Sequence, residues 1–428
     1  MSRARVVDPI GSAFSALAVR DFRYLFASNF SSQIGIWIQQ VAQGWLAFQI
    51  TGSATFLGLV AASRAIPNLL LTLPGGVLAD RWDRRRIIAT SQFVLMGNAL
   101  TLFFLVTTDR IQPWHLMLIA CVGGIADSAN MPARQSLAPQ LAGRARIANA
   151  IALNSISFNI SRILGPSLAG LILAQWGIGP CYAVQAGLLV VAMGWVTRIG
   201  PAGGRLDRDE PDRASIWANL IEGVQYIKTS APIRGVMAIA IIPIYLEIVY
   251  SQLLPVFADV VLDVGGPGLA KMVTAVGIGS MVGAFITAAL STHPRKGMIM
   301  MSVGMFSGVA LIVFATSRAM PTALIALAVT GLTQAITMAM GQTIVNLMVA
   351  NQFRGRVMAI YQMLWSSSPL AMVPAGWTTD HFGPSITVLI SGILVVAFFA
   401  VSSRRTGVVR DFSEQAFRPP SPAPSDVG

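Results

Sequence analysis

Long apolar runs separated by short polar segments follow one another along almost the whole chain. A helix needs about 20 mostly apolar residues to cross a bilayer, and twelve runs reach this length. The strands of a membrane barrel are about 10 residues long and alternate apolar with polar positions, a pattern that these runs lack. We therefore predict an all-α membrane protein whose helices cover residues 22–49, 54–79, 86–107, 113–136, 147–174, 180–199, 234–258, 268–291, 297–317, 321–345, 356–379 and 384–403.

The spacing of these runs predicts two bundles of six helices with a linker between them. Within the linker, a mixed charge run precedes apolar residues at helical spacing up to about Lys228, which suits a short helix on the membrane surface. The tail is rich in proline and serine and is expected to be disordered. The predicted parts are an N-terminal segment 1–21, a first bundle 22–199, the linker 200–233, a second bundle 234–403 and the tail 404–428.

Composition and charge agree with a membrane protein. Apolar residues make up 54% of the chain and charged residues 11%, whereas soluble domains carry about 25% charged residues. The net charge of +12 is not gathered in one patch, as a nucleic-acid site would require. It lies in alternate loops, and the other six loops hold only Arg110, Lys271 and Arg318. Because cytoplasmic loops retain basic residues, we expect the linker and both termini to be cytoplasmic.

Reactive side chains are few and scattered. Two cysteines, Cys121 and Cys181, and three histidines show neither a disulfide framework nor the spacing of metal ligands. The chain has no phosphate-binding glycine loop with its lysine and no evident set of nucleophile, histidine and acid. We therefore expect no cofactor, no metal and no enzymatic activity.

The segment between the second and third predicted helices carries a charged motif, Gly76 through Arg86. It resembles the signature loop Gly-x-x-x-Asp-Arg-x-Gly-Arg-Arg of the major facilitator superfamily. Asp83 stands where that superfamily usually has glycine, and this version looks like the exporter branch that contains macrolide and siderophore efflux proteins. The residues that match the pattern are Gly76, Asp80, Arg81, Arg84 and Arg85.

The fifth predicted helix contains a phrase similar to the antiporter motif of the same superfamily, with Ala169 in place of one glycine. Its glycines permit close helix approach and its proline bends the helix. A kinked packing helix without a special role is the alternative. The phrase consists of Arg162, Gly165, Pro166 and Gly170.

The resemblance implies two pseudo-symmetric bundles and a small-molecule substrate bound between them. Inward movement of protons would drive export by alternating access, and the chain would act as a monomer in the inner (plasma) membrane. A faint internal repeat at an offset of about 206 residues agrees: it aligns Gly170 with Gly376 and Gly177 with Gly383. Two alternatives stay open, namely an uptake symporter on the same fold and a non-transporting membrane sensor or assembly partner.

Ionisable groups deep in a predicted span are costly and often mark function. Four such groups occur: Arg64, Asp127, Arg162 and Glu247. Glu247 lies about 20 Å along its helix, close to the bilayer centre, and a carboxylate buried there can exchange a proton near neutral pH. Our hypothesis makes Glu247 the proton-coupling residue, with Asp127 as the second candidate. Permanent pairing of Glu247 with an arginine is the alternative.

Polar residues also share helix faces. Asp127, Asn130 and Arg134 recur at spacings of three and four residues, and we expect Arg134 to complete a charge lock with the Asp80 loop rather than to bind substrate. The resemblance implies that helices 1, 4, 7 and 10 line the cavity, whose polar groups suit an amphipathic substrate. The proposed cavity residues are Asn29, Gln33, Gln40, Gln43, Arg64, Tyr245, Tyr250 and Gln334.

Overall fold

The computed structural model describes residues 15–143, 146–200, 216–290, 293 and 295–405. This part of the chain consists of helices and short connections and holds no strand, so the predicted all-α class is confirmed. The charged part of the linker lies outside the described residues, as does the predicted disordered tail apart from Arg404 and Arg405, which end the last helix.

Helices of the first half follow the predicted runs closely. The short turn η1 (Ser15–Ala18) leads into α2. The long helices are α2 (Arg20–Thr51), α3 (Ala54–Arg81), α4 (Arg84–Thr107), α5 (Pro113–Ala142), α6 (Ile147–Trp176) and α7 (Gly179–Thr197).

The second half begins with a short helix in the predicted linker, α8 (Ile216–Thr229). A π-helical turn, η3 (Phe257–Val261), extends α9, and a 3-10 turn, η4 (Ser368–Ala371), separates α13 from α14. The other helices are α9 (Ala231–Val256), α10 (Gly265–Ala289), α11 (Lys296–Thr316), α12 (Met320–Met348), α13 (Asn351–Ser367), α14 (Met372–Phe382) and α15 (Pro384–Arg405).

In the described residues, ten helices are long and apolar enough to cross a membrane. The two predicted spans that fall short are α2, which carries many amides, and the run 356–379. We expected the latter to be one helix, but the structure breaks it at η4. Pro369 lies in this turn, and a proline has no N–H to continue a helical ladder. The described helices thus indicate a multi-pass membrane protein, and the run predicted as the eleventh span is interrupted.

The chain divides into two compact units that cut across the sequence halves. Unit 1 is drawn from residues 1–212, 252–277 and 372–381, and unit 2 from residues 213–251, 278–371 and 382–428. Unit 1 therefore includes the C-terminal end of the α9 segment, the first part of α10 and nearly all of α14.

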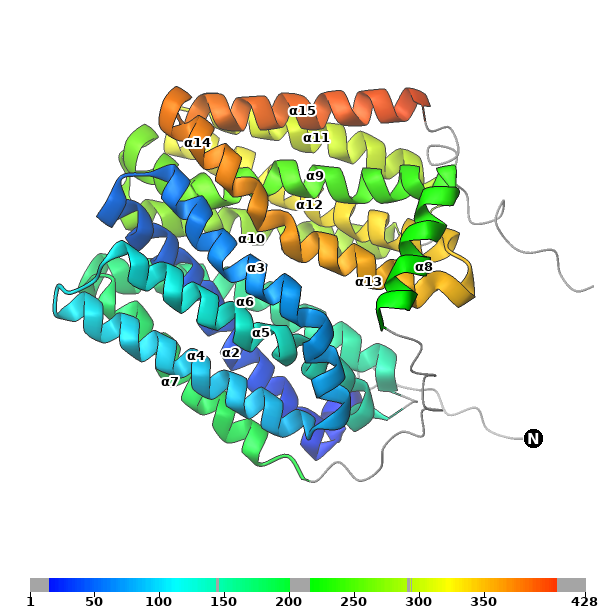
Figure 1. Cartoon of the computed structure of the whole chain (residues 1–428). Coiled ribbons are helices and arrows are strands. Elements are labelled where there is room, and N and C mark those ends of the chain that lie inside the picture. Colours follow the sequence, from blue (N-terminus) through cyan, green and yellow to red (C-terminus); the bar gives the residue numbers. More distant parts are fainter. Residues whose placement is uncertain (1–14, 144–145, 201–215, 291–292, 294, 406–428) are drawn as a thin grey trace, which may run out of the picture. The chain divides into compact units, whose positions relative to one another are not determined.

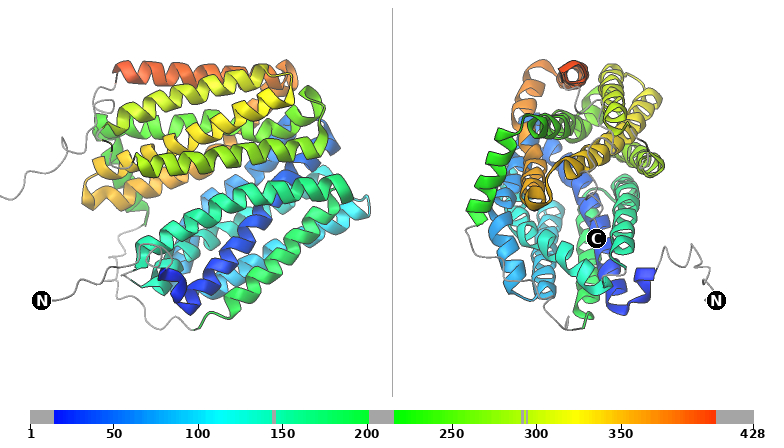
Figure 2. Two further views of the ribbon diagram at one scale, coloured as in Figure 1. Left: turned by 180° about the vertical axis from the view of Figure 1, so that it is seen from behind. Right: turned by 90° about the vertical axis from the view of Figure 1, so that its right-hand side faces the viewer.

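In unit 1, α2 packs against α6 and α7, α3 against α5, and α4 against α7. Figure 2 shows α2 between α6 and α7 when the protein is seen from behind. Near the ends of these helices, a core cluster includes the fully buried Phe22, Leu25, Ile88 and Ala133. Such burial of apolar side chains stabilises the bundle at about 25 cal/mol per Å².

In unit 2, α11 packs against both α12 and α15, and Figure 1 shows α11 directly beside α15. Its core contains Met300, Ile344 and Phe399, none of them exposed. Helix α8 lies on α13, where the Tyr226 and Phe353 rings stack with centroids 4.2 Å apart and Arg356 pairs with Glu222. One face of the linker helix is therefore covered by protein.

Candidate transport site

Glu247 is buried in the middle of α9, with only 2% of its surface exposed. The Ser307 hydroxyl on α11 donates to Oε1 at 2.7 Å, and the Gln334 amide on α12 donates to Oε2 at 3.1 Å. Both donors are neutral. A buried carboxylate is costly to keep ionised without a cation beside it, so this arrangement suits a group that gains and loses a proton.

Tyr245 lies two residues before Glu247 on α9 and is held to α13. Its hydroxyl lies 2.6 Å from the Ser367 hydroxyl and donates to the Leu364 carbonyl at 2.9 Å. Tyr250, also predicted to face the cavity, is only 1% exposed. The structure therefore brings Glu247 and Gln334 together, whereas the hydroxyl of Tyr245 contacts α13 instead.

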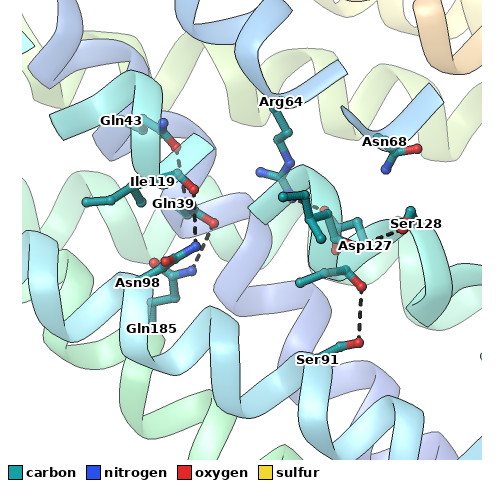
Figure 3. A network of polar contacts seen from close by, with 12 residues as sticks. Gln39, Gln43, Arg64, Asn68, Ser91, Asn98, Ile119, Asp127, Ser128 and Gln185 are labelled. Carbon is teal, nitrogen blue, oxygen red and sulfur yellow. Dashed lines mark hydrogen bonds and ion pairs between the residues drawn. The ribbon is translucent and has the colours of Figure 1, made fainter. Parts of the chain in front are cut away.

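Asp127 on α5 has a cationic partner. The Arg64 guanidinium on α3 lies 2.6 Å from its Oδ2, and Figure 3 shows the two side chains pointing toward each other. The pair is partly buried, with side-chain exposures of 33% for Arg64 and 13% for Asp127. Close packing supports it, since a Cβ on Gly124 would lie 3.0 Å from the Arg64 carbonyl carbon and from the Pro67 ring. The pair therefore ties α3 to α5.

A chain of buried amides joins α2 to α7 in unit 1 (Figure 3). Gln185 Nε2 donates to Gln39 Oε1 at 2.9 Å, and Gln39 Nε2 donates to Gln43 Oε1 at 3.2 Å. The structure thus directs Gln43 to a contact within the first-half bundle. Gln40 is exposed and Gln33 is half-buried. The amides of the predicted polar stripe on α2 therefore lie in different environments.

Arg134 bonds within the bundle. Its Nε donates to Asn130 Oδ1 at 2.9 Å, and a terminal nitrogen donates to Asn29 Oδ1 on α2. The Asn29 amide in turn reaches Asn154 on α6 at 3.4 Å. The shared face of Asn130 and Arg134 is as predicted by their spacing, and it connects α5 to α2.

The charged loop after α3 is held by hydrogen bonds from its arginines. Arg84 donates to Gln140 at 2.7 Å, and Arg85 donates to the Ile199 carbonyl at 2.7 Å. Asp80 and Arg81 belong to the last turn of α3, but their side chains lie outside the described residues, as does any contact between Arg134 and Asp80. Gly76 is half-buried and has open space beside its Cα.

Asp83, the departure from the family pattern, has a local role. Its carboxylate accepts the Arg85 backbone N–H at 3.0 Å and pairs with the Arg85 guanidinium at 2.7 Å, so it caps the N-terminus of α4. Hydrogen bonding from the Arg85 side chain lowers the pKa of Asp83 despite its partial burial. Asp at this position therefore starts α4, a function that glycine performs less well.

The antiporter-like phrase brings α6 close to two other helices. Gly165 meets Trp37 and the Ile34 carbonyl of α2, whereas Gly170 meets Ala270 of α10. The guanidinium of Arg162 lies 5.6 Å from the centre of the Trp37 ring, a cation–π distance. Pro166 is buried inside the helix. Gly165 and Gly170 therefore lie where α6 comes close to α2 and α10.

Sequence reasoning missed several polar partners in these clusters. Gln39 was passed over for its neighbour Gln40, although Gln39 and Gln43 are four residues apart and therefore share a helix face. Gln185 and Ser307 gave no local signal, because they lie on helices far away in sequence. Among the described residues, no group of three or more His, Cys, Asp or Glu gathers as it would around a metal ion.

Comparison with known proteins identifies the family. Residues 11–424 match the model of the transmembrane secretion effector family. The chain is 28% identical to the multidrug efflux pump Tap of Mycolicibacterium fortuitum over 85% of this chain and 90% of the relative, and 25% identical to the staphyloferrin A transporter of Staphylococcus aureus over 89% and 94%.

Among solved structures, the nucleoside transporter NupG (D323A mutant) shares the fold with a TM-score of 0.73 at 13% identity, over 89% of this chain and 99% of that one. The matches cover nearly the whole of each chain. Together with the family model, they confirm the resemblance to the exporter branch that the loop with Asp83 indicated. The chain is thus a membrane transporter rather than an enzyme, and it belongs to the transmembrane secretion effector family of the major facilitator superfamily.

Proposed function

We propose that this protein exports a small amphipathic compound, of the drug or siderophore type, across the cell membrane by alternating access. Protons that move inward would drive the export. The family and the efflux function named for one of its relatives support this direction and substrate class. The substrate would bind between the six-helix halves 22–199 and 234–403, and the protein would work as a monomer in the lipid bilayer.

The observation that carries the coupling is the environment of Glu247, which is buried and accepts hydrogen bonds from two neutral donors. Protonation removes a charge that is costly in this position. If the two states of the transporter expose the carboxyl to opposite sides, a proton bound on one side is released on the other. Asp127 is less suited to this task, because it forms an ion pair with Arg64 that ties α3 to α5.

The gate on the side of the charged loop is proposed to consist of Gly76, Asp80, Arg81, Arg84, Arg85 and Arg134. A carboxylate that holds helices together in only one state biases a population rather than the fold. Asp80→Asn is therefore expected to slow turnover while expression stays near normal. This gate would face the cytoplasm, together with the linker 200–233 and both termini. A membrane-impermeant thiol reagent added outside cells should label a cysteine placed at Asp109 and miss one placed at Asp209.

The test is transport into inverted membrane vesicles. A panel of radiolabelled amphipathic drugs and siderophores is offered while the vesicle interior is made acidic. Export coupled to protons predicts accumulation of at least one compound, which a protonophore abolishes, and no accumulation in vesicles that lack the protein. Accumulation only when the vesicle interior is alkaline would instead indicate an uptake symporter. Absence of gradient-driven transport for the whole panel would overturn the proposed proton-driven export.

A further inference from the structure

The first turn of α3 crosses α14 within unit 1, although the two segments come from opposite halves of the sequence (Figure 1). Asp380, in the last turn of α14, accepts four hydrogen bonds there. Its Oδ1 accepts the Ala54 N–H at 2.6 Å. Its Oδ2 accepts the Thr55 N–H at 3.0 Å, the Ser53 hydroxyl at 2.7 Å and the Thr55 hydroxyl at 2.6 Å. The carboxylate thus caps the N-terminus of a helix that lies more than 320 residues earlier in the chain.

Glycines on both helices bring their backbones into contact beside this cap. A Cβ on Gly58 would lie 2.6 Å from the Met372 carbonyl oxygen, and a Cβ on Gly376 would lie 2.5 Å from the Ala54 carbonyl oxygen. Neither position can carry a side chain unless α3 and α14 move apart. The cap and the close packing are independent observations, and both require the helices to be together.

The charge of Asp380 suits this contact. Burial raises the pKa of its carboxyl, but the hydrogen bonds from Thr55, Ser53 and the backbone outweigh burial, and the pKa lies below its ordinary value. The carboxylate is therefore ionised at neutral pH. An anion at a helix N-terminus is further stabilised by the helix dipole and by the amides that have no partner inside the helix.

A second crossing, between α6 and α10, provides a comparison in the same unit. The sequence repeat aligns Gly170 with Gly376, and Gly170 packs against Ala270 as Gly376 packs against Ala54. There the polar contact is between two neutral hydroxyls, Ser167 and Thr274, 3.0 Å apart. At the repeat offset, the counterpart of Asp380 is Ala174. Only one of these two repeat-related crossings is therefore fastened by a charged cap.

Successive spans alternate in direction, so α3 begins and α6 ends at the end of the bundle opposite the Arg84 loop. We propose that Asp380 is a latch at this end: it fastens the first half of the chain to the second half in one state of the transport cycle and releases the start of α3 in the other. The proposal rests on the alternating-access function proposed above. It assigns a gate residue to the end that the signature loop does not occupy.

Accessibility of Met372 tests the latch. Met372 is fully buried and its backbone touches Gly58, so Met372→Cys is a reporter of separation between α3 and α14. The full-length protein carries Cys121→Ser and retains Cys181, which is 1% exposed in α7 and reports unfolding. Labelling with a polar maleimide in lipid nanodiscs, where both faces are accessible, makes the result independent of topology.

Asp380→Asn is expected to raise the labelling rate at residue 372 about ten-fold, because hydrogen bonds to a charged group are the strongest of the contacts that hold the crossing. Cys181 should stay unreactive. The control is Asp109→Asn, which removes an exposed acid at the same end and suits the positive φ of 52° at that position. It should leave the rate at the parental value.

An unchanged rate in Asp380→Asn would overturn the latch. Labelling of Cys181 together with residue 372 would also count against it, because that result makes Asp380 a residue of general stability. Gly376→Ala is the second variant and should raise the rate in the same direction by forcing the backbones apart. Failure of the vesicle transport assay would refute the proposed export while these labelling results still decide whether the latch exists.

Discussion

Two acids lie well inside the membrane-spanning helices, one in each half of the sequence, and their neighbours differ. Asp127 in unit 1 pairs with a guanidinium at 2.6 Å, whereas Glu247 in unit 2 accepts hydrogen bonds only from a serine hydroxyl and a glutamine amide among the described residues. The ion pair of Asp127 joins two helices, α3 and α5. Neutral donors orient a carboxylate without neutralising it, so protonation remains a way to remove its charge. The comparison separates a structural acid from a candidate proton carrier.

The largest effect is expected from Glu247→Gln. Glutamine keeps the size of the side chain and much of its hydrogen bonding, but it cannot release a proton. Accumulation driven by a pH gradient should fall about 100-fold or more, because the variant loses the proton-transfer step that couples transport to the gradient. Substrate binding and downhill exchange should persist. The measurement compares gradient-driven uptake with counterflow in the same inverted vesicles, and parental uphill transport would remove Glu247 as the carrier.

A smaller effect is expected from the Arg64–Asp127 pair, to which the comparison assigns a structural role. Arg64→Gln and Asp127→Asn each leave one charge without its partner and should lower stability by about 1–3 kcal/mol. The double variant should recover part of that loss. Thermal unfolding in detergent measures both. Gradient-driven accumulation should persist in the double variant, and its loss to the extent seen in Glu247→Gln would break the distinction between the two acids.

The smallest effect is expected from Ser307, which donates to Glu247. Ser307→Ala removes one donor to the ionised carboxylate, and donors of this kind favour the charged form. Protonation then becomes easier, so the pH profile of transport should move toward alkaline values by up to about one unit. Ser280→Ala is the control, because Ser280 is a buried serine in the same unit whose hydroxyl donates to the Gly331 carbonyl instead. A shift toward acidic pH in Ser307→Ala would contradict the assigned role.

The fold could be predicted from the sequence because apolar runs of bilayer length are a direct signal. Helix α4, for example, runs from Arg84 to Thr107 where residues 86–107 were expected. The break at Ser368–Ala371 was missed because the run stays apolar on both sides of Pro369. Tertiary packing decides whether a helix bends or breaks at a proline. The spacing of apolar residues in the sequence does not reveal which of the two occurs.

The candidate site could be predicted only in part. Glu247 stood out as the single acid in its own apolar run, but its donors lie 60 and 87 residues further along the chain. Asp380 was overlooked for a related reason: an acid beside a helix end looks like an ordinary loop residue until the start of α3 is placed against it. Single residues were visible in the sequence, whereas their partners depended on tertiary packing.

Glu247 is proposed to take up and release a proton during transport. Infrared difference spectroscopy of the protein in lipid, recorded between acidic and alkaline pH, detects the carbonyl stretch of a protonated carboxylic acid. We predict such a band near neutral pH that disappears in Glu247→Gln and persists in Asp127→Asn. A band that survives in Glu247→Gln, or that disappears in Asp127→Asn instead, would contradict the account.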